Sequence, residues 1–346
     1  PLPSRIVSQE PMPNVRTVAF HLPQFHPIPE NDAWWGAGFT EWTNVAAARR
    51  RFPGHYQPHV PADLGFYDLR LDESRRAQAE LARRYGIEGF VYWHYWFDGR
   101  RILERPVDEV LRSGEPDLGF ALGWANQTWS GVWHGAPDRI LIEQTYRDDD
   151  RAHFEHLLPF FEDARYLRVG GRPLFYVFRP EQLPDPRAWT DRWRRMASDA
   201  GLPGIYLVAE MSDLVGWGLS FDDPATAGFD AGLHVRIPVH TSAGVRLRMR
   251  FLRRLGLPEI YRYVDRPVER PSVRPPAKVL PCVCPNWDNT PRAGRRGVVA
   301  HGSTPERFRT HVRDAVERLR ERPCDERLLF VKSWNEWAEG NHLEPD

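Results

Sequence analysis

Short apolar runs alternate along this chain with longer segments in which apolar residues recur every three or four positions. The short runs are typical of strands buried on both faces of a parallel sheet, and the longer spacing predicts helices. We predict strands at 16–22, 89–96, 120–126, 173–178, 205–210, 229–234, 279–284 and 328–333. We predict helices at 72–85, 105–113, 148–164, 185–200 and 304–320.

Eight strands alternating with helices predict an α/β fold, a (β/α)8 TIM-type barrel with long loops after its strands, better than an open sheet. Barrels of about 250 residues and more form one domain, so we expect a single catalytic domain at 15–346. Residues 1–14 contain four prolines and are predicted to be an irregular lead-in. We interpret a strongly basic segment within 240–275, with a helical centre, as an insertion or a barrel helix whose arginines face solvent.

The last predicted strand changes abruptly from aliphatic residues to a polar and aromatic cluster. Active sites of parallel barrels lie at the carboxyl ends of the strands. We therefore favour Glu336 and Glu339 as catalytic carboxylates, because Trp334 and Trp337 flank Glu336 and a glycine follows Glu339. The alternative is a pair of glutamates on a solvated helix face, where this spacing is common.

Composition narrows the possible functions. The formal net charge is zero, which argues against a nucleic-acid or anionic-membrane partner, and no apolar run of about 18 residues indicates a membrane span. The 14 tryptophans often stand beside amide and acidic residues, a pattern that favours an aromatic cleft for sugars. No signal peptide is visible, which favours a cytoplasmic location; Pro1 is no initiator residue, so secretion after removal of a leader stays open.

Neither a metal nor a cofactor is expected. The three cysteines lack paired spacing, and the 13 histidines form no tight ligand motif. The acidic run 148–150 resembles the metal-holding motif of nucleotide-sugar transferases, but it opens a predicted helix, where acids complement the helix dipole.

Several segments together resemble a known family, the WbsX-type proteins, commonly labelled lipopolysaccharide-biosynthesis glycosyltransferases. These segments are 20–27 (FHLPQFHP), 34–44 (WWGAGFTEWTN), 54–58 (GHYQP), 92–97 (YWHYWF), 124–126 (WAN), 287–289 (WDN) and 334–346 (WNEWAEGNHLEPD). The family is in turn similar to glycoside hydrolase family 99, the endo-acting α-mannosidases and α-mannanases. That narrower similarity rests on the Asn-Glu-Trp-x-Glu-Gly core and the barrel pattern.

The hydrolase similarity implies specific roles for the two glutamates. Glu336 would be a general base on the sugar's own 2-hydroxyl, and Glu339 a general acid to the departing oxygen. The implied route passes through a 1,2-anhydro sugar that water opens with overall retention. It requires a 2-hydroxyl trans to the leaving group, as in α-mannosides and α-rhamnosides, and two carboxyls of different pKa. Gln127 departs from the family pattern, which commonly has Glu after Trp-Ala-Asn.

Polar and aromatic residues at predicted strand ends and in the long loop after the first strand are candidate substrate contacts. They are His21, Glu41, Trp42, Tyr92, His94, Tyr95, Trp124, Asn126, Gln127, Glu210, Trp287, Asp288, Trp334, Asn335, Trp337 and His342. Alternatives stay open for six of them. These are core packing for His94 and Tyr95, a loop-ordering salt bridge for Glu41, a turn-capping role for Asp288 and likewise for Glu210, and ordering of the last loop for His342.

The sequence thus favours a retaining, endo-acting glycoside hydrolase-like enzyme that cleaves an α-mannan, a rhamnan or a related bacterial surface polysaccharide. The first alternative is a glycosyltransferase of O-antigen or capsule synthesis. The second is a glycan-binding module without catalysis. The oligomeric state is not predicted.

Overall fold

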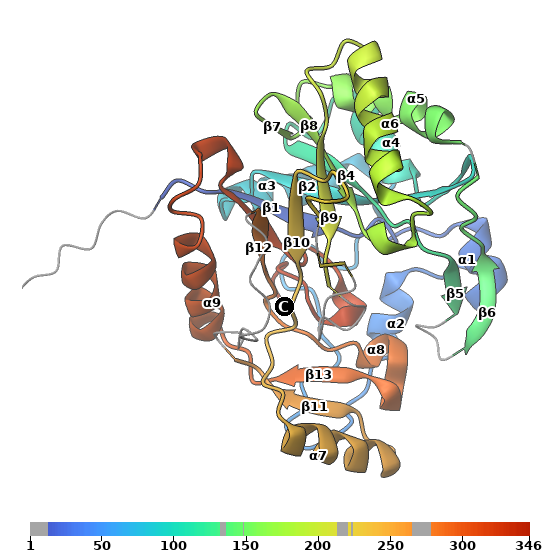
Figure 1. Cartoon of the computed structure of the whole chain (residues 1–346). Helices are drawn as coiled ribbons and strands as arrows, with labels where there is room; N and C mark the ends of the chain where they lie inside the picture. The colour runs from blue at the N-terminus through green and yellow to red at the C-terminus, as the bar shows by residue number, and fades with distance from the viewer. Residues whose placement is uncertain (1–12, 132–135, 148, 213–220, 223, 265–277) are drawn as a thin grey trace, which may run out of the picture.

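A parallel barrel forms the centre of the computed structural model, which describes residues 13–131, 136–147, 149–212, 221–222, 224–264 and 278–346 (Figure 1). Within these residues, eight parallel strands form the barrel: β1 (Arg16–His21), β2 (Gly89–Phe97), β4 (Gly119–Trp124), β8 (Arg172–Val177), β9 (Tyr206–Glu210), β10 (Ala231–His234), β12 (Val279–Val283) and β14 (Leu328–Val331). The barrel closes because β1 pairs with both β14 and β2. The predicted TIM-type fold is confirmed.

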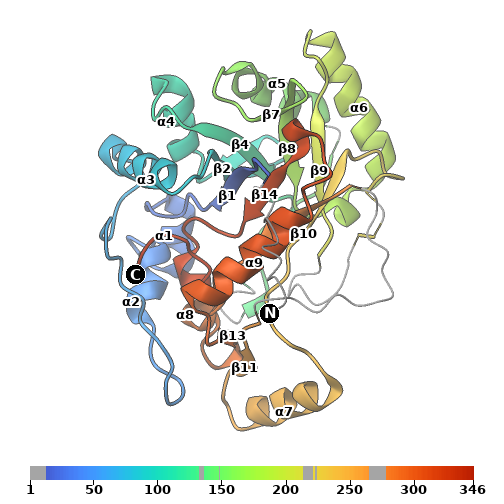
Figure 2. The same ribbon diagram turned by 90° about the vertical axis from the view of Figure 1, so that its left-hand side faces the viewer.

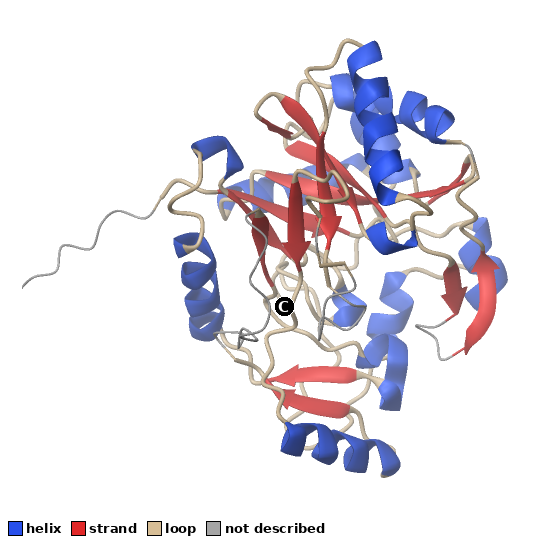
Figure 3. Cartoon of the chain, viewed as in Figure 1, coloured by secondary structure: helices blue, strands red, loops and turns tan. Residues whose placement is uncertain are grey.

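All five predicted helices are present and alternate with the strands (Figure 3). They are α3 (Asp72–Arg84), α4 (Arg105–Ser113), α5 (Asp150–Glu162), α6 (Pro186–Asp199) and α9 (Pro305–Glu317). Local signals fix two of their starts, since the side chains of Asp185 and Thr304 cap the first turns of α6 and α9 and proline follows each cap. The predicted start at 148 lies outside the described residues.

The connections after the strands carry further elements. The loop after β1 holds α1 (Pro29–Trp35) and α2 (Glu41–Ala47), and those after β2 and β4 hold β3 (Arg100–Ile102) and a hairpin of β5 (Trp129–Gly131) and β6 (Ala136–Ile142). The remaining short elements are β7 (Arg168–Val169), η2 (Pro180–Gln182), α8 (Thr290–Ala293), η3 (Gly294–Arg296), η4 (Cys324–Glu326) and η5 (Trp337–Glu339).

The basic segment forms α7 (Ala243–Arg254) and β11 (Glu259–Arg262), which lie away from the barrel in two views (Figures 1 and 2). β11 pairs with β13 (Val298–His301), and Met249, Tyr261 and Trp287 contribute to a small separate core. The segment is thus a helix followed by a strand. Part of the proposed insertion, 265–275, lies outside the described residues. Among the described helices, none combines the length and apolar character needed to cross a bilayer.

Aromatic side chains fill the barrel interior below the site. The ring of Phe20 contacts the rings of Trp93, Tyr176 and Phe330, which come from three other strands. β1 and β8 are not neighbours in the sheet, so the contact between Phe20 and Tyr176 crosses the interior. Gly123 permits this packing, because a Cβ there would lie 3.0 Å from the Tyr176 ring and 3.3 Å from Val91.

Candidate active site

A cavity of about 420 Å³ lies at the carboxyl ends of the barrel strands, where the fold predicts a site. Among the described residues, four charged side chains line it: Glu336, Glu339, Lys332 and Arg292. Its aromatic lining comprises Trp35, Trp93, Tyr95, Phe97, Trp129 and Phe178, and its amide lining comprises Gln24, Gln127 and Gln182. The cavity therefore combines a compact charged cluster with flat apolar rings and neutral hydrogen-bonding groups.

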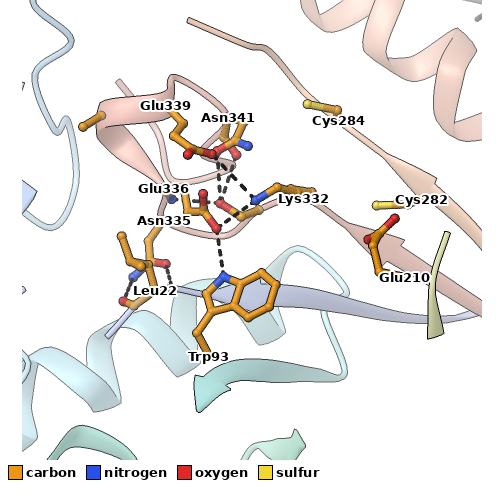
Figure 4. A network of polar contacts seen from close by, with 12 residues as sticks. Leu22, Trp93, Glu210, Cys282, Cys284, Lys332, Asn335, Glu336, Glu339 and Asn341 are labelled. Carbon is orange, nitrogen blue, oxygen red and sulfur yellow. Dashed lines mark hydrogen bonds and ion pairs between the residues drawn. The ribbon is translucent and has the colours of Figure 1, made fainter. Parts of the chain in front are cut away.

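Glu336 is a buried carboxylate held in its ionised form. Lys332 Nζ and Trp93 Nε1 each lie 2.9 Å from Glu336 Oε1 (Figure 4). Burial raises the pKa of Glu336, but the charges of Lys332 and Arg292, together with hydrogen bonds from Glu339 and Lys332, outweigh burial and lower the pKa below its usual 4.5. Glu336 is therefore poised to accept a proton.

Glu339 has the opposite character. Burial, and then the charge of Glu336, raises the pKa of Glu339 well above its usual 4.5, against the opposing charges of Arg292 and Lys332. Arg292 Nη1 lies 2.7 Å from Glu339 Oε1, while the nearest contact of Glu339 Oε2 to a cation is 3.8 Å, to Lys332. Glu339 also hydrogen-bonds Glu336, an arrangement that places a shared proton on Glu339.

A count of formal charges supports one retained proton. Arg292 also binds Glu41 at 2.6 Å, so the cluster holds two cations and three carboxylates. Full ionisation would leave one net negative charge in a buried site, which is costly, and a single proton makes the cluster neutral. Glu41 accepts from Arg292 and from the Ala338 N–H through one oxygen, whereas Arg292 is the one described cation within hydrogen-bond distance of Glu339.

The short turn η5 carries Glu339 and is fixed at both ends. Asn335 accepts from the Leu22 N–H at 2.7 Å and donates to the Leu22 carbonyl at 3.0 Å, which ties the turn to the end of β1. Gly340 ends the turn at φ 63°, and a Cβ there would lie 2.8 Å from the backbone nitrogen of Asp288. The glycine after Glu339 thus allows a tight backbone turn beside Asp288.

Among the predicted substrate contacts, only Tyr95 and Gln127 line the cavity beside the two glutamates. Glu41 is fully buried behind Arg292, so the salt-bridge alternative describes its position. Gln127, where the family pattern commonly has an acid, presents a neutral amide to the cavity.

Three predicted contacts at the ends of β1 and β2 face the surrounding helices instead of the cavity. His21 lies 3.1 Å from Gln78 on α3 and packs against Tyr92, and His94 lies 2.9 Å from His153 on α5. Successive strand residues point to opposite faces, so the neighbours Trp93 and Tyr95 face the cavity. The packing alternative describes His94, and none of these three side chains lines the cavity.

Trp124, the last residue of β4, and Asn126, which follows the strand, also lie outside the cavity wall. The Trp124 ring packs against His153 of α5 and Trp189 of α6. Asn126 donates to the Arg179 carbonyl at 2.8 Å and accepts from the Arg179 N–H at 2.6 Å. Asn126 therefore joins the loops after β4 and β8.

The tryptophans near the two glutamates pack against other aromatic rings outside the cavity lining. Trp334 contacts Phe90, Trp42 contacts Trp337, and Trp337 stacks on His342 with ring centroids 3.8 Å apart. None of these four predicted contacts, nor Asn335, belongs to the cavity lining. They position the turn, which agrees with the loop-ordering alternative for His342.

The remaining predicted contacts are buried in polar or apolar packing. Asp288 lies 2.7 Å from His55 Nε2 and accepts from Gln57 and Thr290. Its neighbour Trp287 belongs to the small separate core that also contains Met249 and Tyr261. Glu210 accepts from Tyr176 and from the Ser212 N–H, and it lies near Cys282 in Figure 4. The capping alternative describes Asp288.

Sequence reasoning missed Trp93, Lys332 and Arg292. The alternation of β2 could have identified Trp93, because it shares a strand face with Tyr95. Lys332 is one of only two lysines in the chain, and this rarity could have marked it as a candidate. Arg292 is one of many arginines, and nothing in its local sequence singles it out.

Comparison with solved structures shows what the fold is similar to. A glycoside hydrolase-like protein superposes with a TM-score of 0.62 at 14% identity, covering 98% of this chain and 90% of that chain. A GH99 endo-α-mannosidase from Bacteroides thetaiotaomicron superposes with a TM-score of 0.53 at 14% identity, covering 95% and 86%. At such identities these likenesses show the barrel fold alone.

Comparison with known sequences is more specific. Two proteins named "Uncharacterized protein WxcX", from strains B100 and ATCC 33913 of Xanthomonas campestris pv. campestris, are each 41% identical to this chain over 333 residues. The match covers 95% of this chain and 47% of each relative, so the chain spans about half the length of these relatives. The model of the family "Glycosyltransferase WbsX" matches residues 17–346. The chain therefore belongs to the WbsX family.

Proposed function

We propose that this chain is a carbohydrate-active enzyme that cleaves α-mannoside-type or α-rhamnoside-type linkages inside a bacterial surface polysaccharide. Glu336 acts as general base and Glu339 as general acid, and the configuration of the sugar is retained. The observation that carries this proposal is a pair of adjacent buried carboxyls in a cavity lined by aromatic rings, where the surroundings lower the pKa of Glu336 and raise the pKa of Glu339.

The first step forms a 1,2-anhydro sugar. Glu336 takes the proton of the substrate's 2-hydroxyl, and that oxygen attacks the anomeric carbon. The glycosidic bond breaks, and Glu339 gives its proton to the departing oxygen. The low pKa of Glu336 and the raised pKa of Glu339 supply the required starting states.

The second step returns both groups to those states. Glu339, now ionised, takes a proton from water as the water oxygen attacks the anomeric carbon. The strained carbon–oxygen bond to O2 breaks, and Glu336 returns its proton to O2. Two inversions give overall retention, and water is the only reactant consumed.

The closeness of the two carboxyls favours this route over direct attack by a carboxylate. Retaining enzymes with a carboxylate nucleophile keep their carboxyls about 5–5.5 Å apart, and inverting enzymes about 6.5–9.5 Å apart. Here the carboxyls hydrogen-bond one another. When substrate binds in this scheme, the hydrogen bond between the two carboxyls is replaced. The 2-hydroxyl then hydrogen-bonds Glu336, and the neighbouring glycosidic oxygen hydrogen-bonds Glu339.

Polysaccharide cleavage with matched variants tests the proposal. We expect wild-type protein to release reducing ends from at least one α-mannan or rhamnan, with retention observed by ¹H NMR of the first product. Glu336→Gln and Glu339→Gln, which keep side-chain shape, should each lower the rate by about 10²–10⁴-fold. A substrate methylated on O2 should resist cleavage, whereas its cleavage at the normal rate would refute the anhydro route.

The family name supports a second candidate, glycosyl transfer. A transferase should gain thermal stability from a nucleotide sugar and should elongate an oligosaccharide acceptor, whereas a hydrolase should respond to oligosaccharides alone. Glycan binding that persists in both glutamate variants, with no turnover by the wild-type protein, would instead indicate a binding module.

A further inference from the structure

His59, His342 and Asp346 form a compact cluster outside the cavity. His59 Nδ1 lies 3.0 Å from His342 Nε2 and 2.7 Å from a carboxylate oxygen of Asp346. The same Asp346 oxygen lies 4.0 Å from His342 Nε2, and all three ligand atoms lie within 4.8 Å of one another. The sequence predicted no metal site, because His59 stands 283 residues before His342 and no local spacing joins them.

We propose that these three side chains bind a divalent transition-metal ion of the zinc class. Zinc–ligand distances of about 2.0–2.2 Å in tetrahedral geometry place ligand atoms about 3.3–3.6 Å apart. The three observed separations lie on both sides of that range, so shifts of a few tenths of an ångström in each side chain suffice. Two imidazoles and one carboxylate suit zinc better than calcium or magnesium, which prefer oxygen ligands.

Groups around the cluster orient it for this role. His342 Nδ1 lies 2.9 Å from the Glu344 carbonyl, so Nδ1 carries the hydrogen and Nε2 presents its lone pair to His59 and Asp346. The His342 ring is held by its stack on Trp337. His59 and His342 are buried, while Asp346 is 29% exposed on its side chain, which gives an ion a path from solvent.

The ion would join two distant parts of the chain beside the turn that carries Glu339. His59 lies between β1 and α3, and the other two ligands follow η5. The Ala62 N–H donates to the Pro345 carbonyl, and Trp337, the first residue of η5, donates to Glu344 at 2.6 Å. The ligands do not line the cavity, so the ion would stabilise the position of η5 without touching substrate.

Metal titration of the chelator-treated, re-dialysed chain tests the site. We expect one zinc ion per chain by calorimetry and elemental analysis, a higher melting temperature with zinc, and visible absorption bands of tetrahedral cobalt after Co²⁺ substitution. Asp346→Asn and His59→Gln should each weaken zinc binding at least tenfold. His240→Gln, which replaces an exposed histidine elsewhere, should leave zinc binding unchanged.

The partly exposed Asp346 keeps the test decisive if His59→Gln unfolds, since circular dichroism can confirm that Asp346→Asn is folded. Zinc affinity unchanged in the folded Asp346→Asn variant would overturn the proposal, as would no stoichiometric zinc binding by the wild-type chain. The readout is metal binding and cobalt absorption, so its result is independent of the proposed hydrolysis.

Discussion

At the scale of residues, the proposed catalysis depends on two neighbouring carboxyls whose surroundings shift their pKa values in opposite directions. Glu336 receives hydrogen bonds from Lys332 and Trp93, while Glu339 shares Arg292 with Glu41. The two glutamates could be predicted from their flanking tryptophans and the family pattern. Lys332 could have been noticed as one of only two lysines, but Arg292 could not, because it arrives from a different strand connection through tertiary packing.

The pH dependence of cleavage should be bell-shaped. Activity needs Glu336 ionised and Glu339 protonated, so the rate falls when pH drops through the lowered pKa of Glu336 and when pH rises through the raised pKa of Glu339. We expect the acidic limb below 4.5 and the alkaline limb well above 4.5, measured as kcat/KM. A single limb near 4.5 would contradict this assignment.

Replacing Lys332 with methionine should move the acidic limb upward. The change removes the positive charge 2.9 Å from Glu336, so the pKa of Glu336 rises and protonation removes the base at a higher pH. We expect a shift of about one pH unit or more and a rate loss of roughly tenfold at acidic pH. Lys278→Met changes the only other lysine, which is exposed, and should leave the profile unchanged.

At the scale of elements, strand phase and one tight turn decide which side chains reach the cavity. The sequence predicted β2 correctly but assigned both strand faces to the site, whereas Trp93, Tyr95 and Phe97, which share one face, line the cavity. When both faces of a strand are apolar, the sequence does not alternate between apolar and polar residues and so does not indicate which face points inward. The turn η5 was better signalled, because a glycine follows the second glutamate.

Gly340→Ala should lower both stability and activity. The new Cβ would meet the Asp288 backbone at 2.8 Å, and an L residue at φ 63° is strained by about 1–3 kcal/mol. Chemical denaturation should show this loss, and kcat should fall because Glu339 is the last residue of the turn. Gly244→Ala in α7 is the matched control, with no atom within 4 Å of the added Cβ, and should be neutral or slightly stabilising.

At the scale of the whole molecule, the barrel could be predicted from the sequence. The part of the cavity wall that the loops form could not. Eight apolar runs separated by helices identify the fold, since each run encodes one buried strand. The pairing of β11 with β13 and the meeting of Trp129 with Tyr95 depend on contacts between distant segments. Local periodicity carries no information about which distant loops meet.

Trp129 joins the hairpin after β4 to the aromatic wall, with its ring centroid 5.0 Å from that of Tyr95. The Trp129 side chain lines the cavity but does not belong to the charged cluster. Trp129→Ala should therefore raise KM for oligosaccharides several-fold with a smaller change in kcat. Trp129→Phe should restore part of the affinity by keeping a flat ring. An unchanged KM in the alanine variant would remove this residue from the substrate wall.

The most direct test of the central claim is a ¹³C NMR titration of side-chain carboxyls in glutamate-labelled protein, with Glu336→Gln and Glu339→Gln used to assign the two resonances. We expect the carboxyl resonance of Glu339 to titrate well above pH 4.5. The resonance of Glu336 should keep the shift of an ionised carboxylate until the pH falls below 4.5. Replacing Glu336 should move the Glu339 midpoint downward, because a neighbouring negative charge is lost. Two independent titrations near 4.5 would contradict the account.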